Sequence, residues 1–163
     1  MRTIGVLLAG MVLLVSGCGS SSSTSADKSQ LQHEADITAI DQIEKTWHKA
    51  GSTKDIDLMM TVWAPDATFT VGGEPYVGKA EIRKFFEAAG PFQPGNNWVS
   101  DTPAYKIRIT ANGDKGTLYF ECHYIDTATG KLVNIVAADQ DVQKIDGKWL
   151  ITTSAAAPAT LAA

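Results

Sequence analysis

The second half of the chain alternates strand-like segments with short turns, and this pattern narrows the folds that it can adopt. Segments rich in β-branched and aromatic residues cover 96–110, 116–126, 132–145 and 148–155. Between them stand NGDKG, TATGK and DG, which carry the glycine, asparagine and aspartate residues typical of hairpin turns. Because short connections join neighbouring strands in opposite directions, this half is predicted to form an antiparallel sheet.

The first half is predicted to hold three helices. In residues 34–51, apolar side chains recur at helical spacing: Ile37, Ile40, Ile43, Trp47 and Ala50. Residues 56–63 form a second, short helix, and residues 79–90 a third, with a strand at 67–71 between them. Helices first and strands afterwards indicate an α+β domain in which three N-terminal helices pack on one face of a curved antiparallel sheet.

Residues 1–17 have the layout of a secretory signal peptide. A single arginine precedes the apolar run VLLAGMVLLV, and small residues stand before Cys18. The run is shorter than the about 20 apolar residues that a membrane span needs. Val15-Ser16-Gly17-Cys18 resembles the lipobox of bacterial lipoproteins, and this resemblance implies cleavage before Cys18 and lipidation of that cysteine. The alternative is a plain signal peptide followed by an incidental cysteine.

Residues 18–32 are predicted to form a flexible tether behind the lipidated cysteine, because small polar residues dominate GSSSSTSADKSQLQ. The folded domain is then expected at 33–157, with a short tail at 158–163. This organisation predicts an extracytoplasmic protein that is lipid-anchored to the bacterial cell membrane, with Cys18 as its contact to the membrane.

Charge and motif chemistry argue against several classes of partner. The formal net charge is -4 and no cluster of Lys and Arg occurs, so nucleic acid is not expected as a partner. The three histidines are far apart in the sequence, so neither a metal site nor a cofactor is predicted. Residues 73–80, GEPYVGKA, imitate a phosphate-binding loop, but Ala80 replaces the Ser/Thr that would bind magnesium and Pro75 lacks a backbone N–H.

Residues 63–86 carry a family resemblance. WAPDATF at 63–69, YVGK at 76–79 and IRKFF at 82–86 resemble the "W/Y-A-x-D-A-x-F... G-x-x-x-I-x-x-F" passage of SnoaL-like proteins, in the nuclear transport factor 2-like superfamily. DVQKIDGKW at 141–149 is similar to the closing hairpin of that family. The resemblance covers residues 34–156 and implies a cystatin-like cone, in which a strongly bent antiparallel sheet wraps round a long helix. It also implies an interior pocket suited to a small apolar or amphipathic molecule, and it allows a homodimer through the outer sheet face.

The residues of this chain that correspond to the catalytic residues of two kinds of relative do not form a complete catalytic set. Where relatives of the ketosteroid isomerase kind have a base carboxylate, this chain has Val71, which cannot accept a proton. The hydrogen-bond donors of that site correspond to Trp47 and Asp141. The arginine and two aspartates of the limonene epoxide hydrolase kind correspond to Phe120, Cys122 and Ser154, so that machinery is absent.

Asp139 and Asp141 are the candidate catalytic residues. They stand two positions apart in the strand-like segment 132–145 and therefore share one face of it with Ile135. If that face lines the cone, burial raises the pKa of Asp141 so that its neutral carboxyl donates a hydrogen bond, while Asp139 lies nearer the mouth. The remaining pocket residues are expected to be Trp47, Trp63, Phe69, Phe86, Phe120, Cys122, Tyr124 and Ile135.

Cys122 is expected to be a small buried hydrophobic residue and not a nucleophile, because the adjacent His123 points to the opposite face of the strand. Three functions remain open. The first choice is binding of a small apolar or amphipathic molecule in the pocket, without assured catalysis. The second is an acid/base enzyme that uses Asp141 and Asp139, and the third is a protein-interaction module that uses the outer sheet face.

Overall fold

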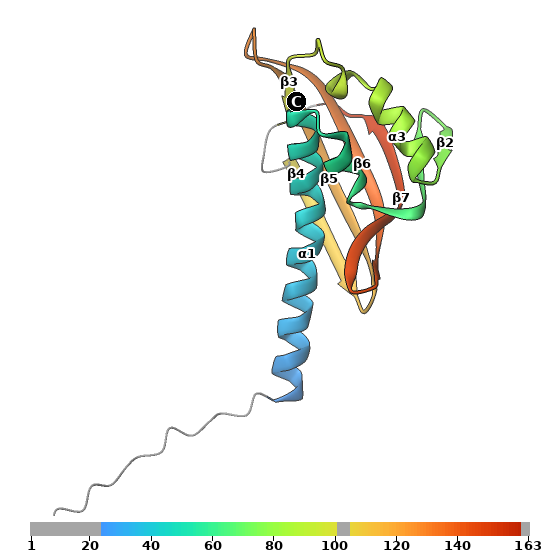
Figure 1. Ribbon diagram of the computed structural model, residues 1–163. Helices are drawn as coiled ribbons and strands as arrows, with labels where there is room; N and C mark the ends of the chain where they lie inside the picture. Colours follow the sequence, from blue (N-terminus) through green and yellow to red (C-terminus); the bar gives the residue numbers. More distant parts are fainter. Residues whose placement is uncertain (1–23, 101–104, 161–163) are drawn as a thin grey trace, which may run out of the picture.

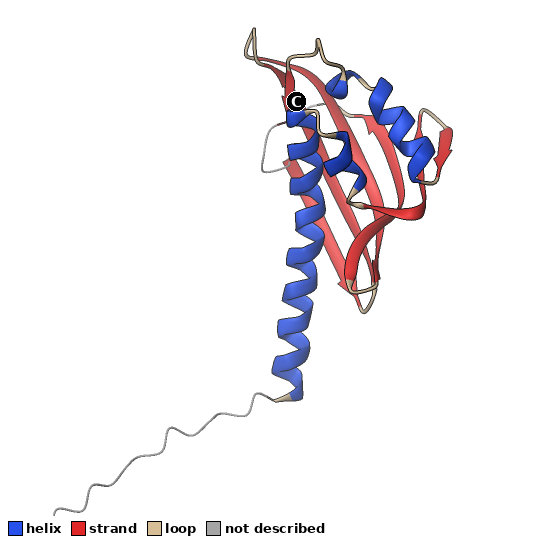
Figure 2. Ribbon diagram, in the orientation of Figure 1, coloured by secondary structure: helices blue, strands red, loops and turns tan. Residues whose placement is uncertain are grey.

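The computed structural model describes residues 24–100 and 105–160. The expected signal peptide and Cys18 lie outside the described residues. The helices are α1 (Ser25–Thr53), α2 (Ile56–Met60), α3 (Lys79–Ala88) and the 3-10 helix η1 (Gly90–Phe92). The strands are β1 (Trp63–Val71), β2 (Glu74–Val77), β3 (Trp98–Ser100), β4 (Tyr105–Asn112), β5 (Lys115–Asp126), β6 (Lys131–Ile145) and β7 (Lys148–Pro158). The predicted α+β class is confirmed (Figures 1 and 2). Strand β2 was not predicted, and the single strand-like segment predicted at 96–110 contains two strands, β3 and β4.

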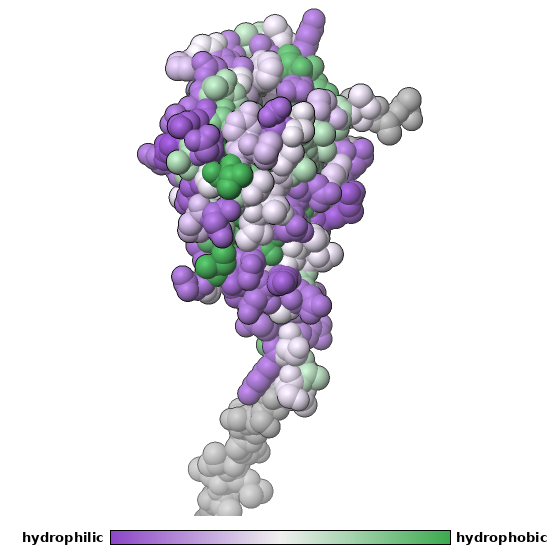
Figure 3. All heavy atoms as spheres, turned by 90° about the vertical axis from the view of Figure 1, so that its right-hand side faces the viewer, coloured by the Kyte–Doolittle hydropathy of each residue, from purple (hydrophilic) through white to green (hydrophobic). Residues whose placement is uncertain are grey.

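Helix α1 begins at Ser25, nine residues earlier than the sequence pattern predicts. The Thr24 hydroxyl accepts a hydrogen bond from the backbone N–H of Asp27, and the Asp27 carboxylate accepts one from the backbone N–H of Thr24. This capping box satisfies N–H groups that the first turn would otherwise leave open, so residues 25–32 are helical and not the expected flexible tether. The first turns extend past the sheet as a narrow, mainly hydrophilic projection (Figures 1 and 3).

The strands form one strongly curved sheet in the order β2-β1-β7-β6-β5-β3, with β4 also paired to β5. The pairs β4–β5, β5–β6 and β6–β7 are antiparallel, as the hairpin turns predict. The prediction that the whole sheet is antiparallel is wrong, because β1 pairs with β7 in parallel. Their connection includes α3 and the other strands, and a connection this long places no constraint on strand direction.

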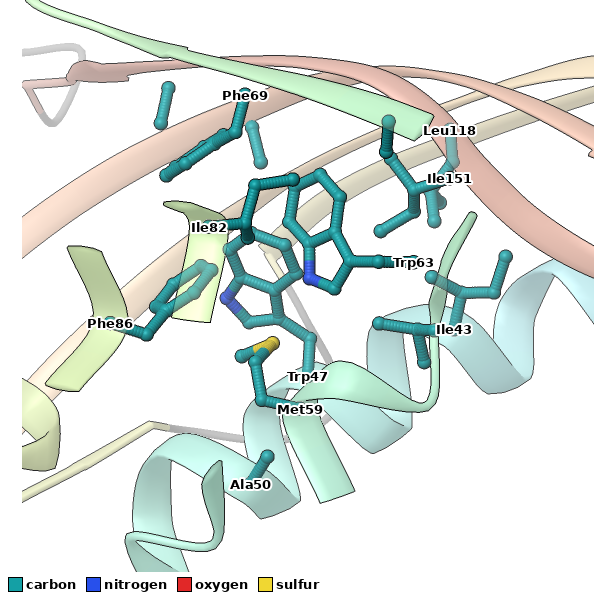
Figure 4. Close-up of a cluster of buried hydrophobic side chains, with 14 of the residues drawn as sticks. Ile43, Trp47, Ala50, Met59, Trp63, Phe69, Ile82, Phe86, Leu118 and Ile151 are labelled. Atoms are coloured by element: carbon teal, nitrogen blue, oxygen red, sulfur yellow. The ribbon is translucent and has the colours of Figure 1, made fainter. Parts of the chain in front are cut away.

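The core lies between α1 and the concave face of the sheet. Helix α1 packs against β3, β4, β5 and β7, while α3 packs against β1 and β2. Trp47 of α1 lies near the centre of this core, with Trp63 and Phe86 beside it (Figure 4). The ring centroids of Trp47 and Trp63 are 5.6 Å apart, and both side chains are almost fully buried. The bent sheet and the long helix together produce the cone that the family resemblance implies.

Candidate functional site

A cavity of about 380 Å³ lies at the wide end of the cone. It is enclosed by α1, the C-terminal part of α3, η1 and the concave face of the sheet. Most of its wall is apolar, and its lining residues are Trp47, Phe69, Val71, Phe85, Phe86, Ala89, Gly90, Pro91, Phe92, Trp98, Cys122, Tyr124, Asn134, Val136, Ala138 and Ala156. Gly90 is exposed, and Trp98 and Asn134 are half-buried, so these residues form the rim.

One wall of the cavity is built from packed aromatic rings. Phe69 of β1 stacks on Phe86 of α3, with ring centroids 5.3 Å apart and an interplanar angle of 14°. Trp47 meets Phe86 edge to face at 5.3 Å. Each ring is held by at least two others, so this wall is rigid and offers flat apolar surface to a bound molecule.

Polar side chains gather at the floor, where β5 passes under α1. Burial raises the pKa of the Cys122 thiol to about 12, against the hydrogen bonds of Ser100 and Tyr124, which lower it. Burial also raises the pKa of Tyr124 well above its ordinary value. Both groups are therefore neutral at physiological pH, and the Tyr124 hydroxyl can donate a hydrogen bond toward the cavity.

Behind the floor, Glu44 and His48 of α1 continue this polar cluster into the core. His48 Nε2 lies 3.1 Å from Cys122 Sγ, and the Glu44 carboxylate binds His48 Nδ1. Glu44 and His48 are 1% and 0% exposed. A carboxylate at Nδ1 holds the proton on that nitrogen, which leaves Nε2 free to accept the thiol hydrogen.

The structure places the sequence-predicted pocket residues in three settings. Trp47, Phe69, Phe86, Cys122 and Tyr124 line the cavity. Trp63 and Phe120 are buried in the core and are not part of the cavity wall. Ile135 lies on the other face of the sheet, where it pairs with His123.

The placement of Asp139 and Asp141 inside the cone is wrong. In β6 the inward-facing residues are Ala138, Gln140 and Val142, which are buried, while Asp139 and Asp141 are exposed. The Asp141 carboxylate accepts a hydrogen bond from the Thr153 hydroxyl, at 2.6 Å, on the outer face. The two aspartates do share a face, as predicted. Strand alternation separates the two faces of β6 but does not identify the inner one.

Sequence reasoning missed Glu44 and His48. They stand four positions apart on a helix, next to the apolar positions Ile43 and Trp47. Residues at this spacing are neighbours on a helix surface, and a carboxylate and an imidazole inside an apolar stripe are a signal of a buried pair. His123, the chain neighbour of Cys122, lies on the other face of the sheet, and the histidine beside the thiol comes from the helix that covers β5.

Within residues 24–100 and 105–160, no three His, Cys, Asp or Glu side chains are grouped so that they could hold a metal ion. No helix in these ranges is both long and apolar enough to span a membrane.

Known proteins share the sequence pattern and the architecture of this chain. Residues 45–150 match the family described as the SnoaL-like domain. No curated protein sequence matches the chain.

Several solved structures resemble the cone at low sequence identity. An NTF2-like protein with a cystatin-like fold from Novosphingobium aromaticivorans has a TM-score of 0.71 at 14% identity, over 87% of this chain and 94% of its own. LinA has a TM-score of 0.69 at 14% identity, over 81% of this chain and 91% of its own. An NTF2-like superfamily protein from Salmonella enterica has a TM-score of 0.63 at 15% identity, over 79% and 95%. At these identities the similarity shows the fold alone.

Proposed function

Because the chain belongs to the family of SnoaL-like domains, we propose that it binds a small apolar or amphipathic molecule in the cavity at the wide end of its cone. The observation that carries this proposal is the cavity itself: about 380 Å³ of space, walled by packed aromatic rings and open at a half-buried rim. Binding pockets for small molecules are commonly about 300–1,000 Å³ and mainly apolar. A core that served stability alone would be filled to a packing density that leaves few voids larger than a water molecule.

The polar groups of the cavity define the expected ligand. Its apolar body would lie against Phe69, Phe86 and Trp47, where each buried CH₂ group contributes about 0.8 kcal/mol. A single oxygen function would accept a hydrogen bond from Tyr124 at the floor or from Asn134 at the rim. Among the residues that the structure describes, no charged side chain lines the cavity, so a neutral ligand is favoured over an ionised one.

Thermal unfolding in the presence of neutral monoterpenes, steroids and aromatic ketones tests the proposal. A ligand that binds only the folded state adds about 2.7 kcal/mol at a hundredfold excess over its Kd, which shifts Tm by several degrees. If every compound class leaves Tm unchanged, the proposal is wrong.

A pair of variants on adjacent positions of β6 locates the binding. Ala138 faces the cavity and Ala137 faces the other side of the sheet. Ala138→Leu should fill part of the cavity and weaken binding about tenfold or more, whereas Ala137→Leu should leave the Kd unchanged. Equal binding by the two variants would place the ligand elsewhere.

We also propose that Cys18 anchors this domain, outside the cytoplasm, to the bacterial cell membrane, as the lipobox resemblance implies. Cys18→Ala should then release the protein into the soluble fraction and abolish incorporation of labelled fatty acid. Retention of the variant in the membrane pellet would argue against the anchor. Homodimerisation through the outer sheet face stays a prediction.

A further inference from the structure

We propose that Cys122, His48 and Glu44 form a thiol site that adds covalently to electrophilic apolar molecules held in the cavity, with α,β-unsaturated carbonyl compounds as the substrate class. This inference rests on the proposed binding function, since the electrophile must first occupy the cavity. It assigns a chemical role to Cys122, which the sequence pattern predicted to be only a small buried residue.

The geometry is that of a nucleophile, a base and a group that orients the base. Cys122 Sγ is 3.1 Å from His48 Nε2, within hydrogen-bond reach, and the Glu44 carboxylate binds the other ring nitrogen. An activated nucleophile typically has a base within about 2.6–3.2 Å that is in turn positioned by a third group. The His48 ring is also held by Phe120, edge to face at 5.3 Å, so the imidazole has a fixed orientation.

The thiol is the member of this set that reaches the cavity. Cys122 lines the cavity wall, whereas neither Glu44 nor His48 is part of it. A bound molecule can therefore touch the sulfur while the base and the carboxylate stay shielded from water behind it. Ser100 and Tyr124 lower the pKa of the thiol, and so act against the effect of its burial. The arrangement thus gives the sulfur a proton acceptor, His48 Nε2, on the side away from the cavity.

The burial of Glu44 and His48 in the core is not explained by stability alone. A carboxylate inside an apolar core costs stability unless it is hydrogen-bonded, and well-packed apolar side chains would carry no such cost. Here both groups lie fully inside an apolar core, with the imidazole directed at the one cavity-lining thiol among the described residues. A role in moving the thiol proton explains why a carboxylate and an imidazole, and not two apolar side chains, are buried at these positions of α1.

The proposed step balances without a further reactant. The thiol proton passes to His48 Nε2 as the sulfur lone pair forms an S–C bond to the β-carbon of the unsaturated carbonyl compound. The π electrons of the C=C bond move toward the carbonyl oxygen to give an enolate, and Glu44 stabilises the imidazolium that has formed. The enolate then takes the proton from His48 at its α-carbon, so that the product is the saturated thioether of Cys122.

The experiment incubates the full chain with 2-cyclohexen-1-one and maps the adduct by peptide mass spectrometry, which separates the Cys122 peptide from the Cys18 peptide. Wild-type protein should carry the adduct at Cys122, with a rate that saturates as the enone concentration rises. His48→Gln and Glu44→Gln should slow this modification about 100-fold, the usual contribution of a positioned base. His123→Gln, which changes the neighbouring histidine on the other sheet face, should leave the rate unchanged.

The pH profile separates proton transfer from simple burial. The titratable groups around the thiol are His48 and Glu44 from α1 and Tyr124 from β5. In His48→Gln the reaction depends on spontaneous ionisation of a buried thiol, whose pKa is raised by its burial, so its rate should rise about tenfold per pH unit between pH 7 and 9. The wild-type rate should rise far less over this range. A wild-type rate that also rises about tenfold per pH unit between pH 7 and 9 would overturn the inference. This outcome can be measured even if His48→Gln fails to fold.

Cyclohexanone, the saturated analogue, distinguishes the two proposals. If it binds in the cavity and the enone does not label Cys122, the thiol inference is wrong and the binding proposal stands. If neither compound binds and no other neutral compound shifts Tm, both are wrong. Cys122→Ser should bind cyclohexanone as wild type does and form no adduct at position 122.

Discussion

The indole nitrogen of Trp149 in β7 donates a hydrogen bond to Oδ1 of Asp36 in α1, at 3.0 Å, across 113 positions of sequence. Lys144 of β6 forms an ion pair with the same oxygen at 2.5 Å, and the Gln32 amide donates to it at 3.2 Å. One carboxylate therefore joins the long helix to both strands of the last hairpin. It lies at the narrow end of the cone, away from the cavity.

Asp36→Ala should destabilise the domain by about 1–3 kcal/mol, because it leaves the buried Trp149 N–H without its acceptor and Lys144 without its counter-ion. Urea unfolding followed by tryptophan fluorescence measures the change. Asp41→Ala is the matched control on the same helix, since Asp41 pairs with the half-exposed Lys45. Loss of an exposed pair of this kind costs about 0.5 kcal/mol or less. Equal losses in the two variants would contradict the role assigned to Asp36.

The Asp36 carboxylate should also make the free energy of unfolding depend on pH. The Lys144 ammonium, together with the Trp149 and Gln32 donors, holds the pKa of Asp36 below its ordinary value in the folded state. The unfolded chain therefore binds this proton more readily, so the stabilisation is complete above about pH 5 and is lost as pH falls below the unfolded pKa of about 3.9. In Asp36→Asn, the free energy of unfolding should fall less than in wild type between pH 5 and pH 3. A parallel loss in wild type and variant would assign the acid sensitivity to other groups.

Most of the helices and strands, and their order along the chain, could be predicted because they depend on local signals. Hairpin turns fix the direction of adjacent strands, and helical spacing marks α1 and α3. The parallel β1–β7 pair could not be predicted in this way, because it joins segments that no turn connects. The early start of α1 depends on the two hydrogen bonds between Thr24 and Asp27, within a segment whose composition is typical of a tether.

The candidate site was predicted only in its apolar part. Trp47, Phe69 and Phe86 lie on patterns that a core requires, so their burial follows from periodicity. Which face of β6 points inward depends on how the sheet curves, and Ile135 and Asp141 were assigned to the wrong face for that reason. The contact between His48 and Cys122 depends on how α1 crosses β5, which no local pattern encodes.

Asp139→Asn and Asp141→Asn should leave ligand binding unchanged, because both side chains lie on the outer face of the sheet and not on the cavity side. Asp141→Leu should also preserve the Kd, although it removes the hydrogen bond from Thr153. Titration of each variant with a ligand identified by thermal shift provides the measurement. A tenfold weaker Kd in any of these variants would return the aspartates to the candidate site.

Gly116 of β5 pairs with Ala111 of β4, and its substitution tests how tightly this part of the domain is packed. A Cβ atom at this position would lie 2.4 Å from the Thr110 carbonyl oxygen, 3.1 Å from Ile40 Cδ1 and 3.3 Å from Val142 Cγ2. Backbone occupies the nearest of these sites and cannot rotate away. Gly116→Ala should therefore destabilise the domain by about 1–3 kcal/mol, the usual cost of an overpacked core.

Gly51→Ala is the control for this substitution, because a Cβ atom at Gly51 would have no neighbour within 4 Å and the residue lies in the last turns of α1. Replacing a helical glycine by alanine stabilises by about 0.5–1 kcal/mol, since alanine loses less conformational freedom on folding. The two glycine-to-alanine changes should thus move the urea midpoint in opposite directions. A Gly116→Ala midpoint at or above that of wild type would show that β4 can shift away from β5 without loss of stability.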